Sequence, residues 1–271
     1  MQQEIFTIAE NEMIADGVWR MGLYGDTSAI TRPGQFVNIK LDGFFLRRPI
    51  SVCDWMPEMG DTPGVLALIY KVVGHGTDAM SALKKDAQLD ILTGLGNGYD
   101  LMKAGEHPVL VGGGVGVPPL YGLARRLVAA GKPVDVILGF NSASDVFYTE
   151  EFEELNDMYD FGCEGFVGER PAVKVHLATV DGSAGTKGFV TDCIQDIEEC
   201  THYYACGPMP MLKALVPAMH MMFPKAVGSL SFEERMGCGF GACVGCSIET
   251  KHGFKKVCSD GPVFESTDVN L

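Results

Sequence analysis

The sequence predicts three modules: an antiparallel β barrel, a parallel α/β domain, and a small carboxy-terminal module rich in glycine and cysteine. Short apolar or alternating runs, separated by glycine and proline, continue to about residue 103. A repeating order of strand, turn and helix follows, and it stops at about residue 228. We therefore expect the modules at residues 1–103, 104–228 and 229–271.

The barrel is predicted from four short runs that have the composition of strands. They cover residues 18–25, 35–41, 64–73 and 89–95. Residues 56–64 suggest the loop of a longer hairpin, and residues 77–85 suggest a helix with Thr77 as its N-cap. The regular spacing of the runs favours an antiparallel barrel.

The α/β domain is predicted from a strand at 107–114, a helix at 117–131 and a strand at 132–140. The helix has one apolar stripe, formed by Leu120, Leu123, Ala124, Leu127 and Val128. Further strands are expected at 172–180 and 202–207, with helices at 190–200 and 210–222. This alternation predicts a parallel sheet covered on both faces.

The composition is that of a globular chain and excludes two classes of partner. Of the 271 residues, 46% are hydrophobic and 21% are charged, which is too apolar for a disordered chain. The formal net charge is −14, and the sequence has no basic run. We therefore expect neither nucleic acid nor a membrane surface as a partner.

The nine cysteines and the first residues predict a reducing compartment. An odd number of unevenly spaced cysteines does not suit a framework of disulfides. Glu4, Glu10, Glu12 and Asp16 occupy the region where a secretory signal needs a cationic flank and an apolar run. We therefore expect a cytoplasmic protein.

Four of the cysteines have the spacing of a plant-type [2Fe–2S] site. Cys238, Cys243, Cys246 and Cys258 are separated by four, two and eleven residues. Glycine permits the tight turns that aim backbone N–H groups at sulfur, and four glycines lie among these ligands: Gly237, Gly239, Gly241 and Gly245. A structural zinc site is the alternative, although zinc sites usually combine two short cysteine pairs.

Two weaker signals in the barrel indicate a flavin nucleotide. Arg48 and Ser51 stand at a strand end, where they could bind a phosphate and a flavin ring. A Gly-x-Gly-Thr sequence that includes Gly76 and Thr77 starts the predicted helix, where N–H groups could bind a pyrophosphate. Taken singly, Arg48 could equally form a surface ion pair, and the glycine and threonine could simply cap the helix.

A glycine-rich turn in the second module indicates a second nucleotide. Gly112, Gly113, Gly114 and Gly116 follow a strand and open a helix, although their spacing differs from the G-x-G-x-x-G fingerprint. Residues 139–154 contain Asp145 and an acidic run but no lysine or arginine. Because a 2′-phosphate needs a basic partner, NADH is favoured over NADPH.

The order of these motifs resembles that of the ferredoxin-reductase superfamily, whose members bind FAD on the barrel and a nicotinamide nucleotide on the α/β domain. The appended cysteine cluster resembles that of the family of electron-transfer subunits of type B dihydroorotate dehydrogenase. The resemblance implies FAD contacts from Arg48, Pro49, Ile50, Ser51, Ile69, Tyr70, Lys71, Gly76 and Thr77. It also implies NAD contacts from Gly112, Gly113, Gly114, Gly116, Cys206, Gly207 and Pro208, and cluster ligation by the four cysteines.

This resemblance implies an oxidoreductase subunit of pyrimidine (UMP) biosynthesis that relays electrons through its cofactors and has no catalytic side chain of its own. Electrons would pass from an FMN-containing catalytic subunit through [2Fe–2S] and FAD to NAD⁺. The implied assembly is a heterotetramer of two copies of each subunit. Two alternatives stay open: a reductase subunit of another complex, of the NADPH:ferredoxin reductase or sulfide dehydrogenase type, and a non-catalytic redox sensor.

Overall fold

The computed structural model describes residues 1–157 and 171–271, and these residues form two units. The first unit joins Met1–Gly98 to Glu233–Val263, and the second joins Tyr99–Phe232 to Phe264–Leu271. The segment that contains the four cluster cysteines therefore packs with the amino-terminal residues. The three-module boundaries expected from the sequence stay a prediction.

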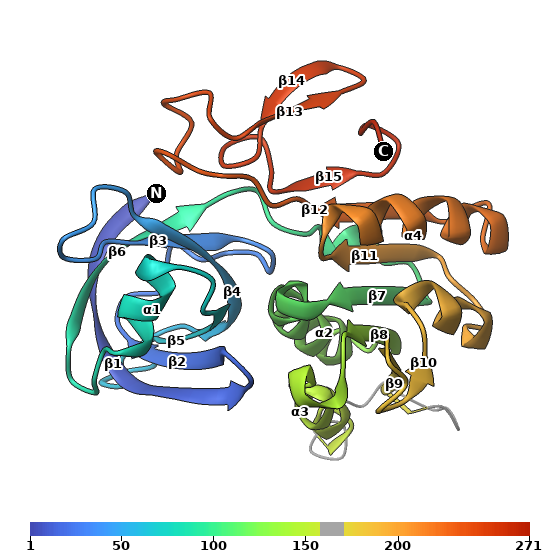
Figure 1. Cartoon of the computed structure of the whole chain (residues 1–271), viewed down its shortest axis with the longest axis horizontal. Helices are drawn as coiled ribbons and strands as arrows, with labels where there is room; N and C mark the ends of the chain where they lie inside the picture. Colours follow the sequence, from blue (N-terminus) through green and yellow to red (C-terminus); the bar gives the residue numbers. More distant parts are fainter. Residues whose placement is uncertain (158–170) are drawn as a thin grey trace. The chain divides into compact units, whose positions relative to one another are not determined.

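The first unit contains a closed barrel of six antiparallel strands, as the sequence predicted (Figure 1). Around the barrel the order is β1-β2-β5-β4-β3-β6. The strands are β1 (Gln2–Ala15), β2 (Val18–Tyr24), β3 (Phe36–Ile39), β4 (Arg48–Met56), β5 (Val65–Lys71) and β6 (Gln88–Leu95). Because β4 pairs with β5, residues 57–64 form the predicted hairpin loop.

Alternating apolar side chains fill the inside of the barrel. Val37 and Ile39 of β3 are fully buried there, together with Leu66 and Leu68 of β5. Because successive side chains of a strand point to opposite faces, the residues between these point away from the barrel core. This alternation places the residues at positions 36 and 38 on the outer face of β3.

The single α-helix in the described part of the barrel unit starts earlier than predicted. It is α1 (His75–Ser81), and its N-cap is Gly74 rather than Thr77, so the predicted cap is wrong. Thr77 is the third helical residue, and its hydroxyl accepts a hydrogen bond from the N–H of Val73 at 3.0 Å. A threonine hydroxyl can satisfy a free N–H from inside the first turn as well as from the cap position.

The cysteine-bearing segment adds a small hairpin to the first unit. It consists of β13 (Ser247–Thr250) and β14 (Gly253–Lys256), which pair antiparallel between the third and fourth cysteines. Asn97 anchors the end of this segment, because its Nδ2 donates to the carbonyl of Val263 at 2.8 Å and its Oδ1 accepts from the Val263 N–H at 3.1 Å.

The second unit contains a sheet of seven strands in the order β10-β9-β8-β7-β11-β12-β15. These strands are β7 (Pro108–Gly113), β8 (Val134–Phe140), β9 (Val173–Thr179), β10 (Thr186–Lys187), β11 (His202–Cys206), β12 (Val227–Ser231) and β15 (Val263–Glu265). The pairs from β10 through to β12 are parallel, which confirms the predicted parallel sheet.

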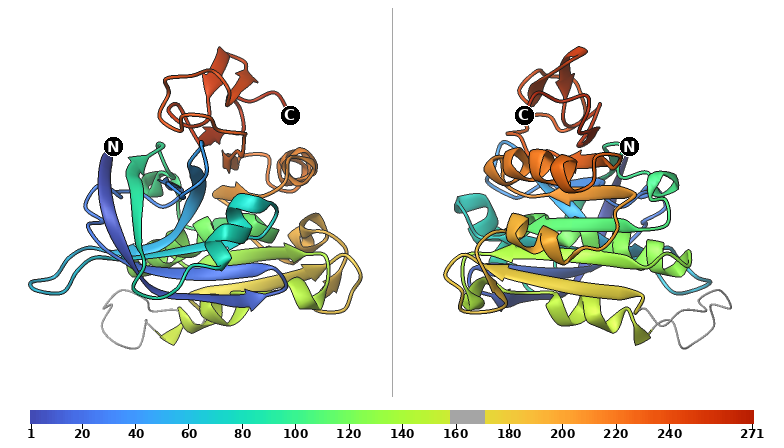
Figure 2. Two further views of the ribbon diagram at one scale, coloured as in Figure 1. Left: turned by 60° about the vertical axis from the view of Figure 1, so that its left-hand side comes forward. Right: turned by 90° about the vertical axis from the view of Figure 1, so that its right-hand side faces the viewer.

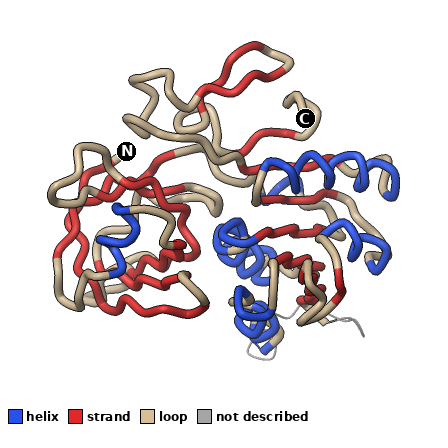
Figure 3. The backbone as a smooth tube through the Cα atoms, in the orientation of Figure 1, coloured by secondary structure: helices blue, strands red, loops and turns tan. Residues whose placement is uncertain are grey.

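Helices connect these strands (Figure 3). The α-helices are α2 (Pro118–Ala129), α3 (Thr149–Glu154) and α4 (Met209–Met222), and the short 3₁₀ segments are η1 (Leu101–Lys103), η2 (Gly114–Gly116), η3 (Ala143–Asp145) and η5 (Val190–Asp196). Right-handed crossovers that run in opposite directions across a sheet place their helices on opposite faces of the sheet. Accordingly, α2 packs on β7 and β8, whereas η5 packs on the same strands and on α4, which lies in front of the sheet in the right-hand view of Figure 2.

The helix predicted at 190–200 is wrong in type and length, because the chain forms the 3₁₀ segment η5 there and leaves it at Asp196. Val190, Thr191 and Ile194 are β-branched and Asp192 competes for backbone N–H groups, so this stretch has low α-helix propensity. In the described residues, no helix is long and apolar enough to cross a bilayer.

Candidate functional site

The four predicted ligand cysteines lie together in the first unit as two neighbouring pairs. The N–H of Cys243 donates to Cys238 Sγ at 3.4 Å, and the N–H of Cys258 donates to Cys246 Sγ at 3.5 Å. The N–H of Gly241 adds a bond of 3.2 Å to Cys258 Sγ. Backbone donors aimed at sulfur stabilise thiolates, as a metal-bound sulfur requires.

The two pairs differ in how readily their thiols ionise. Burial opposes ionisation of Cys238, but the backbone N–H groups of Cys243, Phe240 and Ala242 outweigh it and lower its pKa to about 6. Burial, followed by the adjacent thiol of Cys246, raises the pKa of Cys258 to about 12. One ligand is therefore largely prepared as a thiolate, whereas Cys258 needs a nearby cation such as iron to lose its proton.

The predicted glycines fall into two groups around these cysteines. Gly239 and Gly241 have φ angles of +79° and +90°, which side-chain-bearing residues rarely adopt. Gly237 and Gly245 lie where a Cβ would be 3.5 and 3.7 Å from Cys243 Sγ. The loop thus depends on the backbone angles of Gly239 and Gly241, whereas a Cβ on Gly237 or Gly245 would make only an ordinary contact with the sulfur.

The arrangement of the thiols suits a binuclear cluster better than one metal ion. A structural zinc ion needs four ligands around one centre, whereas each iron of a [2Fe–2S] cluster takes two cysteine thiolates. The two pairs, Cys238 with Cys243 and Cys246 with Cys258, would provide two thiols for each of two irons.

The remaining cysteines lie outside this loop. Cys53, Cys193, Cys200 and Cys206 are described, and none of the eight described cysteines forms a disulfide. Cys163 falls outside the described residues.

The Arg-Pro-Ile-Ser sequence forms the beginning of β4 on the outside of the barrel. Asn38 and Phe36 of β3 pair with Pro49 and Ser51 of β4, respectively. Directly opposed residues of an antiparallel pair share a face. Pro49 and Ser51 therefore lie on the outer face, and the intervening Ile50 packs against the barrel core.

Arg48, the first residue of β4, meets Gly76 of α1. A Cβ on Gly76 would collide with the Arg48 guanidinium, so glycine is needed for the helix start to approach the strand. The guanidinium carbon lies 4.8 Å from the Phe44 ring centre, and Nη1 donates to the carbonyl of Leu46 at 2.6 Å. The structure thus brings together the two motifs proposed to bind the ring and pyrophosphate of a flavin nucleotide.

The other three predicted flavin contacts, Ile69, Tyr70 and Lys71, lie at the end of β5. The side chain of Tyr70 belongs to the barrel core, and its hydroxyl donates to Asn11 Oδ1 at 2.9 Å. Burial, only partly offset by that hydrogen bond, raises the pKa of Tyr70 to about 12. Ile69 is buried and Lys71 is half-buried, so contacts of Ile69 and Tyr70 with a flavin are restricted to backbone atoms, and the assignment stays a prediction.

The glycine turn and the Cys-Gly-Pro sequence meet in the second unit. Gly112 of β7 pairs with Cys206 of β11, and a Cβ on Gly116 would overlap the carbonyl of Cys206. A Cβ on Gly207 would lie 3.2 Å from the backbone nitrogen of Gly113. These glycines let the carboxyl ends of β7 and β11 approach each other closely, and the N–H groups of such a turn can bind a nucleotide phosphate.

This place is the switch point of the sheet. From β7 the chain continues through β8 to β9 on one side, and β11 and β12 lie on the other side. Ligands of open α/β sheets bind where the strand order reverses in this way. Since Pro118 and Pro119 begin α2 and have no N–H, hydrogen-bond donors here must come from the glycine turn rather than from the first helical residues.

The chain after the carboxyl end of β8 contains Asp145, the acidic residue that favoured NADH over NADPH. Ser142 Oγ donates to Asp145 Oδ2 at 3.1 Å, and the Ser142 and Ser144 hydroxyls lie 3.0 Å apart. A carboxylate and hydroxyls suit a ribose with a free 2′-hydroxyl and oppose a 2′-phosphate. This supports the preference for NADH, which stays a prediction.

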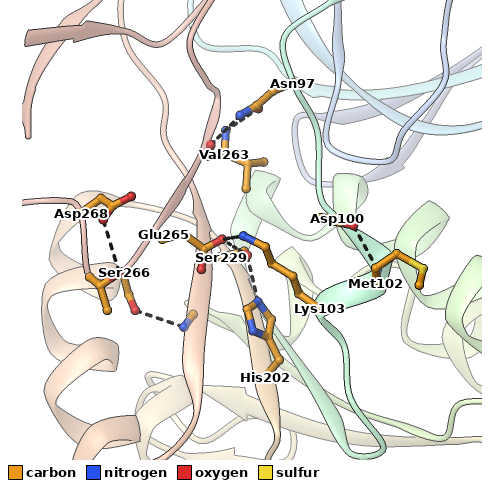
Figure 4. A network of polar contacts seen from close by, with 12 residues as sticks. Asn97, Asp100, Met102, Lys103, His202, Ser229, Val263, Glu265, Ser266 and Asp268 are labelled. Carbon is orange, nitrogen blue, oxygen red and sulfur yellow. Dashed lines mark hydrogen bonds and ion pairs between the residues drawn. The ribbon is translucent and has the colours of Figure 1, made fainter. Parts of the chain in front are cut away.

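A polar network, buried at His202 and Ser229, holds the carboxy-terminal residues to the sheet of the second unit (Figure 4). His202 Nε2 lies 2.9 Å from Ser229 Oγ, which donates to Glu265 Oε1 at 3.1 Å, and Lys103 Nζ donates to the same carboxylate oxygen at 2.7 Å. Burial lowers the pKa of His202 to about 4. The histidine is therefore neutral near pH 7 and has a structural position.

Family models match two parts of the chain. Residues 233–270 match the iron-sulfur cluster binding domain of dihydroorotate dehydrogenase B, and residues 110–216 match the oxidoreductase NAD-binding domain. The first match contains all four predicted cluster cysteines. The second contains the glycine turn and the Cys-Gly-Pro sequence that are predicted to bind NAD.

Curated proteins are similar to the chain over its full length. The dihydroorotate dehydrogenase B (NAD(+)) electron transfer subunit of Fusobacterium nucleatum is 40% identical, with 100% of both chains covered. The protein of the same name from a Geobacillus strain is 41% identical, also with 100% of both chains covered.

Solved structures share the fold. A subunit of an NADH-dependent reduced ferredoxin-NADP oxidoreductase, described for flavin-based electron bifurcation, has a TM-score of 0.82 and 29% identity, covering 98% of this chain and 89% of that one. The cytochrome b5 reductase domain of Ulva prolifera nitrate reductase has a TM-score of 0.63 and 18% identity, covering 85% and 97%. The second likeness concerns the fold alone.

Proposed function

Because this chain belongs to the family of electron transfer subunits of dihydroorotate dehydrogenase B (NAD(+)), we propose that it carries electrons from a catalytic partner subunit to NAD⁺. Its cofactors are FAD and a [2Fe–2S] cluster, and NAD is the exchangeable substrate. The observation that carries the assignment is the arrangement of Cys238, Cys243, Cys246 and Cys258 as two thiol pairs in the same unit as the barrel.

The side chains have binding and positioning roles. A bound flavin exchanges hydride with a nicotinamide and single electrons with an iron–sulfur centre, so it connects the two kinds of carrier. Arg48, Pro49, Ile50 and Ser51 would hold its ring and phosphate, and Gly76 and Thr77 would donate N–H groups to its pyrophosphate. The glycine turn that ends at Gly116 would admit the NAD pyrophosphate next to Cys206.

The partner proposed for this chain is an FMN-containing dihydroorotate dehydrogenase that oxidises dihydroorotate in pyrimidine biosynthesis. We propose two copies of each subunit in the assembly. A reducing cytoplasmic location fits this role, because the four cluster thiols must stay reduced to bind iron.

The runner-up is a reductase subunit of the NADPH:ferredoxin type, which the solved ferredoxin-NADP oxidoreductase represents. The acidic environment of Asp145 and the higher identity to the dihydroorotate dehydrogenase relatives favour the first reading. NADPH oxidation faster than NADH oxidation would support the runner-up.

The decisive experiment is co-purification of this chain with an FMN-type dihydroorotate dehydrogenase, followed by measurement of dihydroorotate-dependent NAD⁺ reduction. Cys238→Ser should abolish this coupled reaction and leave NADH-to-dye transfer intact, because the dye accepts electrons from the flavin. Cys193→Ser is the matched control and should leave both reactions intact, since that buried cysteine lies in the other unit. A Cys238→Ser complex that retains full coupled activity would falsify the electron order.

A further inference from the structure

Asn38 connects the cluster loop to the outer face of the barrel. It lies in β3 and is only 1% exposed, and its Nδ2 donates to the carbonyl of the first ligand, Cys238, at 3.2 Å. A Cβ on the next residue, Gly239, would collide with the same Nδ2, so glycine is needed there for the loop to approach. The amide of Asn38 thus sets where the loop begins.

The carbonyl half of the same amide has no partner among the described residues. Asn38 Oδ1 is buried and accepts no hydrogen bond from residues 1–157 or 171–271. The amide cannot simply be turned over, because its NH₂ group is needed by the Cys238 carbonyl. A buried acceptor is seldom left unsatisfied in a native protein, so Oδ1 needs a donor that the described part of the chain does not supply.

The position of Asn38 identifies what kind of donor this is. Asn38 is paired directly with Pro49, inside the sequence proposed to hold the flavin, and both lie on the outer face of the barrel. A flavin carries such donors: the imide N–H of its ring and the hydroxyls of its ribityl chain. A group bound against Pro49 and Ser51 therefore lies on the same face as Asn38.

We infer that Asn38 is a positioning residue that links the two redox groups, with Nδ2 holding the Cys238 carbonyl and Oδ1 accepting a hydrogen bond from an N–H or O–H of the bound flavin. This inference rests on the proposed binding of FAD at the Arg-Pro-Ile-Ser sequence. Through these two contacts, one buried amide fixes the position of the cluster loop relative to the flavin.

Asn97 provides a matched control, because it is an asparagine that also binds backbone groups of the cysteine-bearing segment. It binds the far end of that segment, at Asp260 and Val263, and its Oδ1 already accepts from the Val263 N–H. A change at Asn97 weakens the attachment of the segment without touching Cys238 or the residues of β4.

The test compares Asn38→Leu and Asn97→Leu in the full-length, cluster-loaded chain from which FAD has been removed. FAD is titrated back and its Kd is measured by flavin fluorescence, and the electron paramagnetic resonance (EPR) spectrum of the reduced cluster is recorded. Asn38→Leu should weaken FAD binding about three- to tenfold, the effect of one lost hydrogen bond, and should alter the EPR g values. Asn97→Leu should change neither and should only lower the thermal unfolding midpoint.

Each outcome decides a part of the proposal. A Kd of Asn38→Leu within twofold of the parent value overturns the flavin contact, and unchanged g values overturn the cluster contact. If Asn38→Leu does not fold, Asn38→Ser, whose hydroxyl is too short to reach both groups, is judged by the same criteria. If the parent protein binds no FAD, the proposed function fails and the inference fails with it.

Discussion

Gly116 lies so close to Cys206 that a Cβ at position 116 would overlap the Cys206 carbonyl group. We expect Gly116→Ala to push the glycine turn away from β11 and to lower kcat/KM for NADH by about tenfold or more, since a misplacement of about 1 Å at a binding site can cost a hundredfold. The measurement is NADH-dependent dye reduction at varied NADH concentration. FAD content and the cluster spectrum should match the parent, because both groups belong to the other unit. An unchanged kcat/KM would exclude this turn from the NAD site.

A second prediction concerns the choice of nucleotide. Asp145→Arg replaces a carboxylate by a planar cation that pairs well with phosphate, so we expect the ratio of kcat/KM for NADPH to that for NADH to rise about tenfold or more. Glu198→Arg has the same change of charge at an exposed residue before the amino end of β11 and should leave the ratio unchanged. Equal effects of the two variants would indicate a general electrostatic effect rather than a contact at the ribose.

The third prediction separates the cluster ligands from the other buried cysteines. We expect Cys246→Ser to lose the [2Fe–2S] spectrum, because one iron then lacks one of its two thiolates. Cys53→Ser should keep iron and sulfide at two each per chain, since Cys53 is equally buried but lies in β4. Chemical analysis of iron and sulfide measures both. Binding of one zinc ion by the parent in place of two irons would contradict the assignment.

The cluster-binding loop could be predicted from local sequence because its chemistry depends on the spacing of cysteines and glycines along the chain. Three cysteines within nine residues and four nearby glycines define a cluster loop wherever it folds. The parallel sheet was predictable for the same reason, because each strand and helix has its own apolar pattern. Such features need no knowledge of long-range contacts.

Features that depend on long-range contacts could not be predicted. Strand β1 has no clear alternation, because Ile5 and Met13 are exposed while Phe6 and Ile8 are buried, and the strand gains its partners from β2 and β6. The role of Asn38 depends on a hydrogen bond to a residue 200 positions away. Nothing in the sequence around position 38 indicates that contact.

The last prediction concerns pH and His202. Its pKa is about 4 in the folded chain against 6.5 for an unperturbed histidine, because burial disfavours the charged form. Between these two pH values the unfolded chain binds more protons at His202 than the folded chain does. The contribution of neutral His202 to the free energy of unfolding is therefore fully present above pH 6.5 and is lost as the pH falls toward 4. The contribution is on the order of 3 kcal/mol, at about 1.4 kcal/mol per pKa unit. His202→Gln should therefore weaken the dependence of the urea unfolding free energy on pH between 4 and 6.5, whereas the exposed His220→Gln should keep it. Equal pH profiles for His202→Gln and the parent would show that the Ser229 and Glu265 network, rather than the imidazole, carries the acid sensitivity.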